Sequence, residues 1–394
     1  MNPAIVEVTG STIRALHAKR RPTSINLGIG EPTLRPNIAH FEAATRWIAE
    51  NGCRYSTNIG DADLRAAIAA KYAYPTLSHA DNVCITTGSQ EAVYVAMRTL
   101  LDPARDTVLV AEPAFPVYVK IAQIEGVRCD RVAIDPQRSD AFDAETILAA
   151  VTPATRLIVI CSPCNPTGRV ITRATVKRIA GGLLARGGEP VYVLHDEIYR
   201  ELVYTEDVGE FGKVYPYTIS INSLSKSNAL TGLRLGWMMA PADIMPQFVK
   251  MHGWLTSCAS TYAMRVAMEV FRTNDLGAHR PWYVAQRTRV LEALRASGLD
   301  FVEPEGGFYA CVRVGDPSMD TLAFAEALID ERDVVAIPGH IFTPKMAGWL
   351  RTSFVGDIAQ IADAYDRIAS FASERKSLAT ARNGGSAPAQ SDAN

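Results

Sequence analysis

One lysine and one arginine stand among hydroxyl side chains in the segment from Ser223 to Trp237. Lys226 is flanked by Ser225 and Ser227, and Arg234 follows eight residues later. A lysine that acts as a nucleophile must be uncharged for part of its reaction, and a neighbouring fixed cation disfavours its charged form. Serine hydroxyls and a forked guanidinium together also bind phosphate. The segment therefore predicts an amine nucleophile beside a phosphate site.

This combination describes a cradle for pyridoxal 5′-phosphate, and the segment resembles the cofactor-lysine signature of class I and II aminotransferases. These are fold type I pyridoxal-phosphate enzymes of the aspartate aminotransferase superfamily. The resemblance implies that Lys226 forms a Schiff base with the cofactor, and that Ser223, Ser225 and Arg234 bind its phosphate. On this segment alone, the alternative is a polar strand-to-loop connection with a solvated Lys226. The other motifs of the chain decide between the two.

The bulk composition is that of an ordinary globular protein. The chain has 394 residues, of which 48% are hydrophobic and 21% charged, and its formal net charge is −2. This length allows two domains, and the scattered basic residues leave no footprint for nucleic acid or an anionic membrane. We find no signal peptide and no run long enough to span a bilayer, so we predict a cytoplasmic protein.

The seven cysteines follow no regular spacing, which favours reduced thiols over a disulfide framework. Cys161 and Cys164 form a C-x-x-C motif that suggests zinc or redox chemistry. However, no second pair completes a zinc site, and the motif overlaps a turn with chemistry of its own. We therefore predict no metal site.

From about residue 82 the sequence alternates between β-rich runs and helical spacing, which indicates a sheet with crossover helices. The first unit joins a strand at 83–87 to a helix at 91–101 through Gly88, Ser89 and Gln90. Such a turn presents free backbone N–H groups and a hydroxyl at the positive end of a helix. We predict that these three residues bind the cofactor phosphate.

Two further strands deliver polar residues at their carboxyl ends, where open α/β sheets bind ligands. Asn165 lies in an N-P-T-G turn after an apolar run, and Asp196 and Tyr199 follow a second run. A buried acid requires a cationic partner, and a protonated pyridine nitrogen provides one. The resemblance adds that Asn165 and Tyr199 bond the cofactor's phenolic oxygen, with Asn165 also on the substrate side. We expect Lys226, Asp196 and Tyr199 to be the catalytic residues.

Four more positions match the family pattern, and the resemblance gives each a role. Phe115 stacks on the pyridine ring, and Tyr55 crosses a dimer interface to the phosphate of the partner's cofactor. Gly30 lies against the substrate α-carboxylate, which Arg351 binds with its forked guanidinium. The alternatives are a plain core aromatic for Phe115, a surface residue for Tyr55 and a turn for Gly30.

Together these motifs predict the α/β fold of the fold type I pyridoxal-phosphate transferases. We expect a large domain with a mostly parallel seven-stranded sheet flanked by helices, and a smaller α+β domain. The expected parts are an N-terminal arm with part of the small domain at 1–45, the large cofactor-binding domain at 46–285, and the C-terminal small domain at 286–372. A long helix at 275–296 leaves the large domain, and a disordered tail occupies 373–394.

The resemblance implies a homodimer with sites at its interface that moves an amino group between an L-amino acid and a 2-oxo acid. A β-lyase, a decarboxylase or a cyclising enzyme on the same scaffold is the alternative, because the same residues serve whichever Cα bond breaks. A transcription regulator with an aminotransferase-like domain is more remote, since we find no DNA-binding module or basic patch.

One departure from the family pattern concerns the substrate. Aspartate aminotransferases of the best-known subgroup hold the substrate's side-chain carboxylate with an arginine from the partner subunit, and the corresponding region here, 252–262, has no arginine. Arg20, Arg21 or Arg35 could take that role. An aromatic, neutral or biosynthetic amino acid is therefore as open as a dicarboxylic one.

Overall fold

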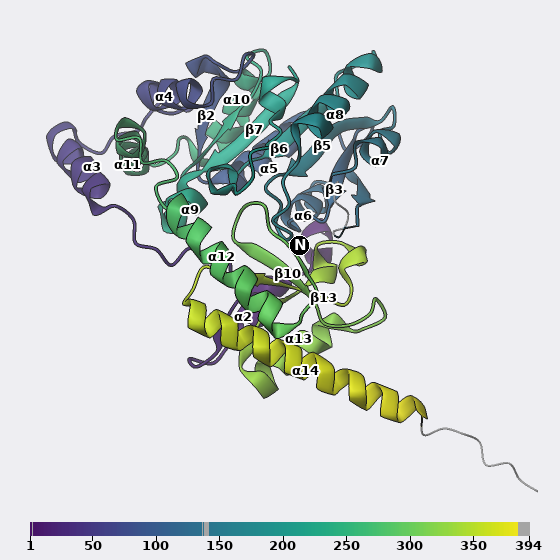
Figure 1. Ribbon diagram of the computed structural model, residues 1–394. Helices are drawn as coiled ribbons and strands as arrows, with labels where there is room; N and C mark the ends of the chain where they lie inside the picture. The colour runs from purple at the N-terminus through teal and green to yellow at the C-terminus, as the bar shows by residue number, and fades with distance from the viewer. Residues whose placement is uncertain (2, 136, 138–141, 385–394) are drawn as a thin grey trace, which may run out of the picture.

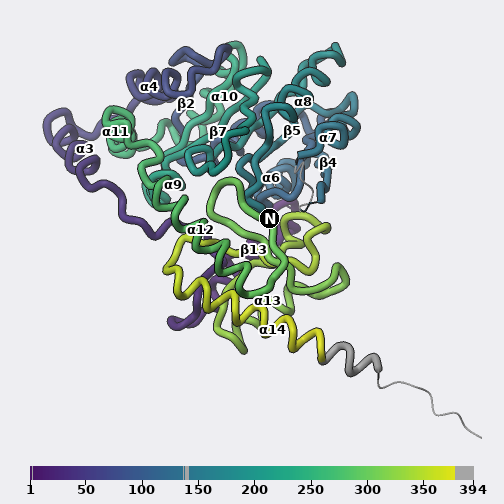
Figure 2. Tube along the Cα trace, viewed as in Figure 1, coloured from purple at the N-terminus to yellow at the C-terminus, as the bar shows by residue number. Residues whose placement is uncertain are grey.

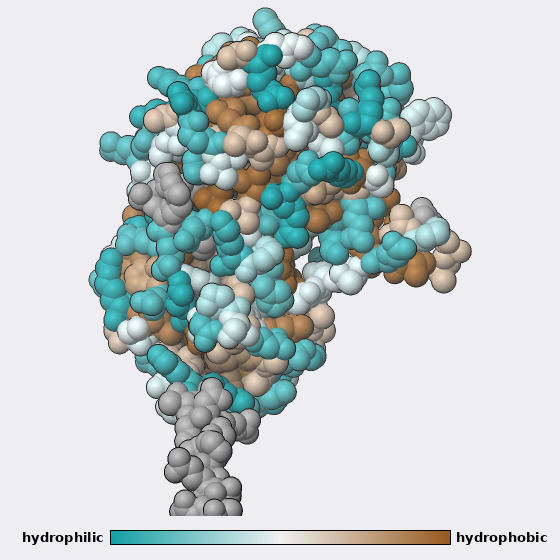
Figure 3. Space-filling model, turned by 90° about the vertical axis from the view of Figure 1, so that its right-hand side faces the viewer, coloured by the Kyte–Doolittle hydropathy of each residue, from teal (hydrophilic) through white to brown (hydrophobic). Residues whose placement is uncertain are grey.

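The computed structural model of the chain describes residues 1, 3–135, 137 and 142–384. Its elements form two layered bodies (Figure 1), a larger one around a seven-stranded sheet and a smaller one around a four-stranded sheet. Among the described residues, no helix is both long and apolar enough to cross a bilayer. On the face shown in Figure 3, hydrophobic residues gather in the upper half, and hydrophilic ones lie between and around them.

The large sheet has the strand order β2-β8-β7-β6-β5-β3-β4, and only β8 runs antiparallel to its neighbours. This confirms the predicted mostly parallel, seven-stranded α/β sheet. The central strands β3 and β5 are mostly apolar and buried because helices cover both faces, whereas the edge strand β4 is polar and partly exposed. The strands are β2 (Val83–Thr86), β3 (Thr107–Glu112), β4 (Arg128–Ala133), β5 (Thr155–Cys161), β6 (Tyr192–Asp196), β7 (Thr218–Ser223) and β8 (Gly236–Met239).

The register of the central strands decides where the functional side chains meet. Cys161 on β5 pairs with Asp196 on β6, and Asp196 pairs with Ile221 on β7. The carboxyl ends of these three parallel strands therefore align at one edge of the sheet. The turn that carries Asn165 and the short helix α9 (Leu224–Ser227) that carries Lys226 both begin at this edge.

Helices cover the two faces of the large sheet. On one face α5, α6 and α10 share a core with alternate side chains of the strands, and on the other face α7 and α8 pack centrally, with α4 and α11 beside β2 and β8. Helix α3 packs along α11. The helices are α3 (Ile38–Asn51), α4 (Ala62–Tyr72), α5 (Ser89–Leu100), α6 (Val117–Ile124), α7 (Ala144–Ala149), α8 (Arg173–Ala185), α10 (Met245–Thr256) and α11 (Thr261–Arg272).

The smaller body is an antiparallel sheet with the order β12-β13-β10-β9, packed against three helices in a core of its own. Its strands are β9 (Phe301–Val302), β10 (Tyr309–Arg313), β12 (Ile337–Pro338) and β13 (Trp349–Ser353), and its helices are α12 (Arg280–Ser297), α13 (Thr321–Arg332) and α14 (Ile358–Gly384).

The N-terminal segment belongs spatially with this smaller body. Strand β1 (Ile25–Asn26) pairs in parallel with β11 (Val334–Val335), so residues more than 300 positions apart form a two-stranded sheet. Figure 2 shows the purple N-terminal trace beside the yellow-green C-terminal part. Helix α2 (Thr12–Ala18) precedes β1 and places Leu16 in the same core, whereas α1 (Pro3–Glu7) buries no residue.

Two sequence-based expectations about helices need correction. The long helix expected at 275–296 starts only at Arg280, because Asn274 and Gly277 have positive φ and Pro281 occupies the first turn of α12. The tail expected to be disordered from residue 373 is helical through Gly384, and residues 385–394 lie outside the described part of the chain.

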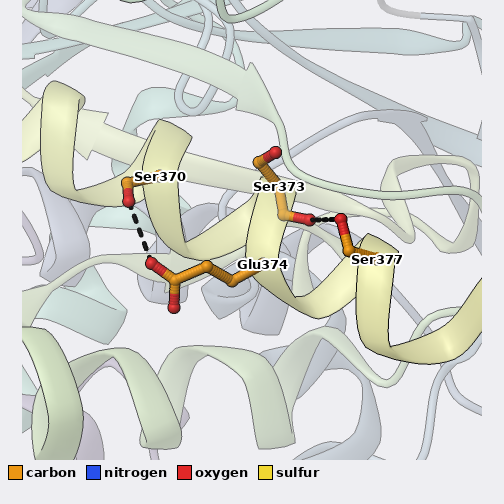
Figure 4. A pocket seen from close by; sticks show the side chains of 4 residues that line it. All are labelled: Ser370, Ser373, Glu374 and Ser377. Atoms are coloured by element: carbon orange, nitrogen blue, oxygen red, sulfur yellow. Dashed lines mark hydrogen bonds between the residues drawn. The ribbon is translucent and has the colours of Figure 1, made fainter. Parts of the chain in front are cut away.

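Hydrogen bonds and an ion pair support the C-terminal part of α14, although its polar composition predicts disorder. Ser370 donates to Glu374 Oε1 at 3.0 Å, and Ser377 donates to the carbonyl of Ser373 at 3.0 Å (Figure 4). Glu374 also pairs with Arg332 of α13 at 2.5 Å. The four residues of α14 in Figure 4 line a shallow hollow along one helix face, and the two hydrogen bonds drawn there lie within the helix.

Candidate active site

Lys226 is positioned by the end of strand β7. Ser223, the last residue of β7, caps α9 by accepting a hydrogen bond from the Ser225 N–H at 3.1 Å. This cap turns the chain so that Lys226 Nζ donates to the carbonyl of Gly30 at 2.7 Å. The side chain also lies over the Phe308 ring, with Nζ 5.9 Å from the ring centroid.

The surroundings of Lys226 favour its neutral form. Burial lowers the pKa of Lys226 from 10.5 to about 8; Glu31 and Asp196 raise it, and the guanidinium groups of Arg351 and Arg234 lower it further. An amine with a pKa of about 8 is partly neutral near physiological pH, as a nucleophile or base must be. The structure thus gives the predicted nucleophile the electrostatic setting that its chemistry needs.

Several hydrogen-bond donors lie together at the start of α5. Gly88 has φ +85° and caps α5, and a Cβ atom there would lie 2.5 Å from Arg234 Nη2. Arg234 is itself left-handed, with φ +52°, and its Nη1 donates to the Thr231 carbonyl at 3.0 Å. A Cβ at Gly236 would lie 2.6 Å from the Ser89 nitrogen, so glycines keep β8 and α5 in close contact. The free amides at this helix start and the guanidinium suit a phosphate group.

Asp196 is buried at the carboxyl end of β6. Its Oδ2 accepts from the Tyr118 hydroxyl at 2.7 Å, and its Oδ1 accepts from the Ile198 N–H at 3.2 Å. Burial raises the pKa of Asp196 to about 6, although these hydrogen bonds and the charge of Lys226 oppose the rise. A buried carboxyl group with this pKa is incompletely compensated, and a cationic ring nitrogen beside it would complete the pairing.

Arg351 and Asn165 meet between the two sheets. Arg351, on β13, donates from Nη1 to Asn165 Oδ1 at 3.1 Å and from Nη2 to the Gly28 carbonyl. Its guanidinium carbon lies 4.5 Å from the centroid of the Tyr309 ring. Arg351 is fully buried, and its Nε has no hydrogen-bond partner within the described residues. A buried guanidinium with spare donors suits a carboxylate ligand.

Gly30 and Tyr199 are joined through Tyr309. A Cβ at position 30 would overlap the Tyr309 hydroxyl, so this position accepts only glycine while Tyr309 keeps its place. Tyr199 donates to the Tyr309 hydroxyl at 3.4 Å. The Gly30 loop, β10 and the segment after β6 therefore contact one another directly beside Lys226.

Three predicted cofactor ligands lie at the margin of the residues gathered around Lys226. Phe115 is half-buried, with its ring 6.5 Å from the Tyr118 ring in an edge-to-face arrangement. Gln90 lies in the first turn of α5 with an exposed side chain. Tyr55 is 90% exposed, so this protomer does not bring it to its own Lys226.

Three other polar side chains near the site make hydrogen bonds within the protein, which indicates a structural role for them. Glu197 accepts from Tyr74, Ser220 and Arg200, and these charges and hydrogen bonds outweigh burial and lower its pKa. The thiols of Cys161 and Cys164 donate to the carbonyls of Pro163 and Pro113, at 3.5 and 3.2 Å. Within the described ranges, no group of three or more histidines, cysteines or acids is arranged to hold a metal ion.

A comparison with known families decides what this arrangement belongs to. The family model for aminotransferase class I and II matches residues 22–368. This chain belongs to the class I and II aminotransferases. It is 32% identical to a probable N-acetyl-LL-diaminopimelate aminotransferase of Bacillus subtilis over 397 residues, which cover 98% of this chain and 99% of that one.

Two further comparisons agree. An aspartate aminotransferase of Pyrococcus horikoshii is 30% identical over 380 residues, covering 92% of this chain and 95% of the relative. The solved structure of an aspartate aminotransferase from Thermus thermophilus with maleate superposes with a TM-score of 0.86 at 26% identity, covering 94% of this chain and 99% of that one. The protein is therefore an aminotransferase of fold type I, as predicted, and its family implies pyridoxal phosphate as the cofactor. The β-lyase, decarboxylase, cyclising enzyme and regulator alternatives are not favoured.

The structure also shows how the three arginines proposed for a distal carboxylate lie in this aminotransferase. Arg21 is held by Asp330 and Asp333 on the smaller body, with its nitrogens 3.8 Å from an oxygen of each. Arg20 contacts the ring of His17. Arg35 is exposed.

Sequence reasoning does not identify Tyr118 or Tyr309 as parts of the aminotransferase site. Tyr118 lies on the first turn of α6, three residues after Phe115, and this closeness in sequence to a predicted cofactor residue is the signal that could have indicated it. Tyr309 has no such local signal, because its importance comes from contact with Gly30, which is 279 positions earlier in the chain.

Proposed function

We propose that this aminotransferase binds pyridoxal 5′-phosphate in the site around Lys226 and moves an amino group between an L-amino acid and a 2-oxo acid. The donor set fits this cofactor. Gly88, Ser89 and Arg234 bring backbone amides and a guanidinium together for its phosphate, and Asp196 offers a buried carboxylate for its ring nitrogen. When bound, the cofactor supplies an electron sink that makes the Cα proton of an attached amino acid acidic.

The observation that carries the proposal is the buried amine of Lys226 with its lowered pKa. We propose that Lys226 forms the Schiff base with the cofactor. Its lowered pKa leaves a neutral amine on Nζ at moderately alkaline pH. A neutral amine can attach the cofactor, and once the substrate has displaced it, Nζ can accept the Cα proton and pass it on to the cofactor. Gly30 orients Nζ through its carbonyl.

The remaining predicted residues bind and orient. Asp196 would supply negative charge to the ring nitrogen of a bound cofactor, and Tyr118 fixes the orientation of its carboxylate. Tyr199 and Asn165 offer a hydroxyl and an amide for the cofactor's phenolic oxygen, while Ser223 and Ser225 shape the turn beside the phosphate. The Phe115 ring provides an apolar wall.

We propose that Arg351 binds the substrate's α-carboxylate. Its guanidinium is buried, has a spare Nε donor, and already meets Asn165. A carboxylate can accept two parallel hydrogen bonds from one guanidinium, which fixes the orientation of Cα as well as providing affinity. The names of the relatives cover an N-acetylated diamino diacid and aspartate, so they do not agree on the substrate side chain.

We also propose that the functional unit is a homodimer. Tyr55 and Trp254 are 90% and 87% exposed, which is unusual for large aromatic side chains. They belong to one surface, because Thr261 donates to the Arg54 carbonyl at 2.6 Å, and a Cβ at Gly253 would lie 2.5 Å from Asn58 Nδ2. In such a dimer Tyr55 would reach the partner's cofactor.

The cytoplasmic location of the protein stays a prediction from the sequence.

The test is a half-reaction with one amino acid at a time. Purified holoenzyme is mixed with each L-amino acid in the absence of any acceptor, and the 2-oxo acid, ammonia and carbon dioxide that form are measured. We expect up to one 2-oxo acid per site and no other product, and the fastest donor identifies the substrate class. Ammonia or carbon dioxide in repeated turnovers would overturn the proposal.

A further inference from the structure

The connection between β9 and β10 extends from the smaller body to the turn that carries Asn165. The N–H groups of Glu305 and Gly306 both donate to the carbonyl of Gly168, each at 2.8 Å. Gly168 ends the N-P-T-G turn, three residues after Asn165. Two hydrogen bonds to one carbonyl oxygen use both of its lone pairs, so this is a fixed junction.

The side chain of Glu305 adds a second set of contacts to the same turn. Its Oε2 accepts from the Val170 N–H at 2.9 Å, and its Oε1 lies 3.2 Å from Arg169 Nη1. The Glu305 and Arg169 side chains are 31% and 16% exposed, so this ion pair is partly shielded from solvent. A carboxylate that accepts from a backbone amide and a guanidinium makes charge-assisted hydrogen bonds, which are stronger than neutral ones.

Close packing shows that the junction leaves little freedom. A Cβ at Gly168 would lie 2.5 Å from Pro304 Cβ, and a Cβ at Gly306 would lie 2.5 Å from Pro163 Cγ. The two loops therefore contact each other backbone to backbone on both sides of Asn165. Neither loop can move without displacing the other.

The far end of the connection leads into the site. Gly307 donates to the Leu202 carbonyl at 2.9 Å, and Tyr204 donates its N–H to the Glu305 carbonyl at 2.7 Å. Tyr309 follows directly and contacts Gly30 and the guanidinium of Arg351. One short loop thus ties the Asn165 turn of the large body to the strand that supports Arg351.

From this geometry we infer that Glu305 is a positioning residue for substrate binding. It holds the Asn165 turn against β10, and so it fixes the distance between Asn165 and Arg351. It does not contact Gly88 or Arg234, which are proposed to bind the cofactor phosphate. This inference rests on the proposed function, because it takes Arg351 and Asn165 as the substrate-facing pair. Loss of the Glu305 contacts should weaken substrate binding and leave cofactor binding intact.

The test compares Glu305→Ala and Glu305→Gln holoenzymes with wild type. In the half-reaction, we expect Glu305→Ala to raise the KM for the amino acid about tenfold, as loss of a charge-assisted hydrogen bond would. The cofactor Kd should stay within about twofold of wild type, since the residues proposed for its phosphate, its ring nitrogen and its covalent link lie outside the Asn165 turn. Glu305→Gln should recover most of the loss, because its amide oxygen can still accept from Val170.

Glu303→Gln is the matched control. Glu303 lies two residues earlier in the same connection but pairs with Arg287 and Arg295 on α12, away from the turn. We expect its KM to equal that of wild type. An unchanged KM in Glu305→Ala would overturn the inference, and so would parallel losses of cofactor affinity and KM, because they would indicate a general structural role.

Hydrogen exchange makes the test independent of activity. In Glu305→Ala, peptides covering residues 163–171 should exchange faster than in wild type and in Glu303→Gln, since Val170 loses its acceptor. Unchanged exchange there would contradict the inference whatever the enzyme catalyses. A wild-type enzyme that forms no 2-oxo acid would instead contradict the proposed function.

Discussion

Arg351 Nη1 donates to Asn165 Oδ1 at 3.1 Å, although the two residues are 186 positions apart in the chain. The contact joins the turn after β5 to strand β13. In the proposed site, the residue on the large body contacts the cofactor and the residue on the smaller body contacts the substrate. Their relative position therefore sets how the substrate lies against the cofactor.

Replacing Arg351 should damage substrate binding more than any other change outside the cofactor site. We expect Arg351→Ala to lower kcat/KM about 100-fold, which corresponds to about 2.7 kcal/mol and suits the loss of a buried charged partner. Arg351→Lys should also be impaired, because lysine keeps the charge but lacks the fork. Steady-state kinetics on the preferred amino acid measures both.

Arg313→Gln is the control for the Arg351 variants. Arg313 lies on the neighbouring strand β10, and its guanidinium lies over Trp349 rather than over Tyr309. Its kcat/KM should stay near that of wild type. If Arg351→Ala retained wild-type kcat/KM in a folded protein, the α-carboxylate would have to bind elsewhere.

Tyr118→Phe should weaken the charge on Asp196. The Tyr118 hydroxyl bonds the carboxylate and lowers the pKa of Asp196, so its removal should raise that pKa further above about 6. Cofactor association with the apoenzyme requires a charged Asp196. The acid limb of the pH profile of this association, where it falls off as Asp196 is protonated, should therefore move to higher pH. We also expect about a fivefold lower turnover, as for the loss of one buried hydrogen bond.

Tyr215→Phe controls for the loss of a buried tyrosine hydroxyl. Tyr215 donates to the Val191 carbonyl at 2.6 Å, in the core formed with α7 and α8. This variant should keep the wild-type pH profile. An acid limb that stays in place, or moves to lower pH, in Tyr118→Phe would disprove the proposed role of Tyr118.

Replacing Arg234 should shift the pH at which Lys226 becomes reactive. Burial is the main cause that lowers the pKa of Lys226 to about 8, and the positive charges of Arg351 and Arg234 lower it further. Arg234→Gln removes one of these charges and so should raise the pKa, which moves the onset of amine reactivity to higher pH. Arg234→Lys keeps the charge and should keep the onset near wild type. The apoenzyme is labelled with an amine-reactive reagent at a series of pH values. Mass spectrometry of the peptide that contains Lys226 then gives the pH at which this amine becomes reactive. An onset unchanged or lowered in Arg234→Gln would refute it.

Mixing two defective variants tests whether Tyr55 serves the partner's site. Lys226→Ala should be inactive, and Tyr55→Ala should bind cofactor more weakly. In a mixed dimer, one site would combine an intact Lys226 with an intact Tyr55 from the other subunit. We therefore expect one site of wild-type cofactor affinity per mixed dimer. If every active site in the mixture keeps the weakened affinity of Tyr55→Ala, Tyr55 acts within its own subunit or not at all.

The sequence predicts the fold well where local patterns carry the information. The strand predicted at 83–87 is β2 (Val83–Thr86), and the helix predicted at 91–101 is α5 (Ser89–Leu100), because β-rich runs and helical spacing are local signals. Asn165, Asp196 and Lys226 then converge because parallel strands align their carboxyl ends at one edge.

Long-range contacts limit what the sequence reveals. Tyr309 and Tyr118 are two of 14 tyrosines, and only folding brings them to Gly30 and Asp196. The helical extension of α14 was hidden for a related reason: ion pairs with α13 stabilise a segment whose composition resembles a polar tail. Tyr55 is exposed in one protomer, so its predicted role depends on a partner.

The most direct test of the account locates the cofactor on the chain. Holoenzyme is treated with borohydride, which makes the link between the cofactor and an amine permanent, and the digested protein is analysed by mass spectrometry. We predict that the cofactor mass is found on the peptide containing Lys226, and that Lys226→Ala shows no labelled peptide. Attachment at another lysine, or an unmodified Lys226 in an active holoenzyme, would contradict the assignment of Lys226 as the catalytic amine.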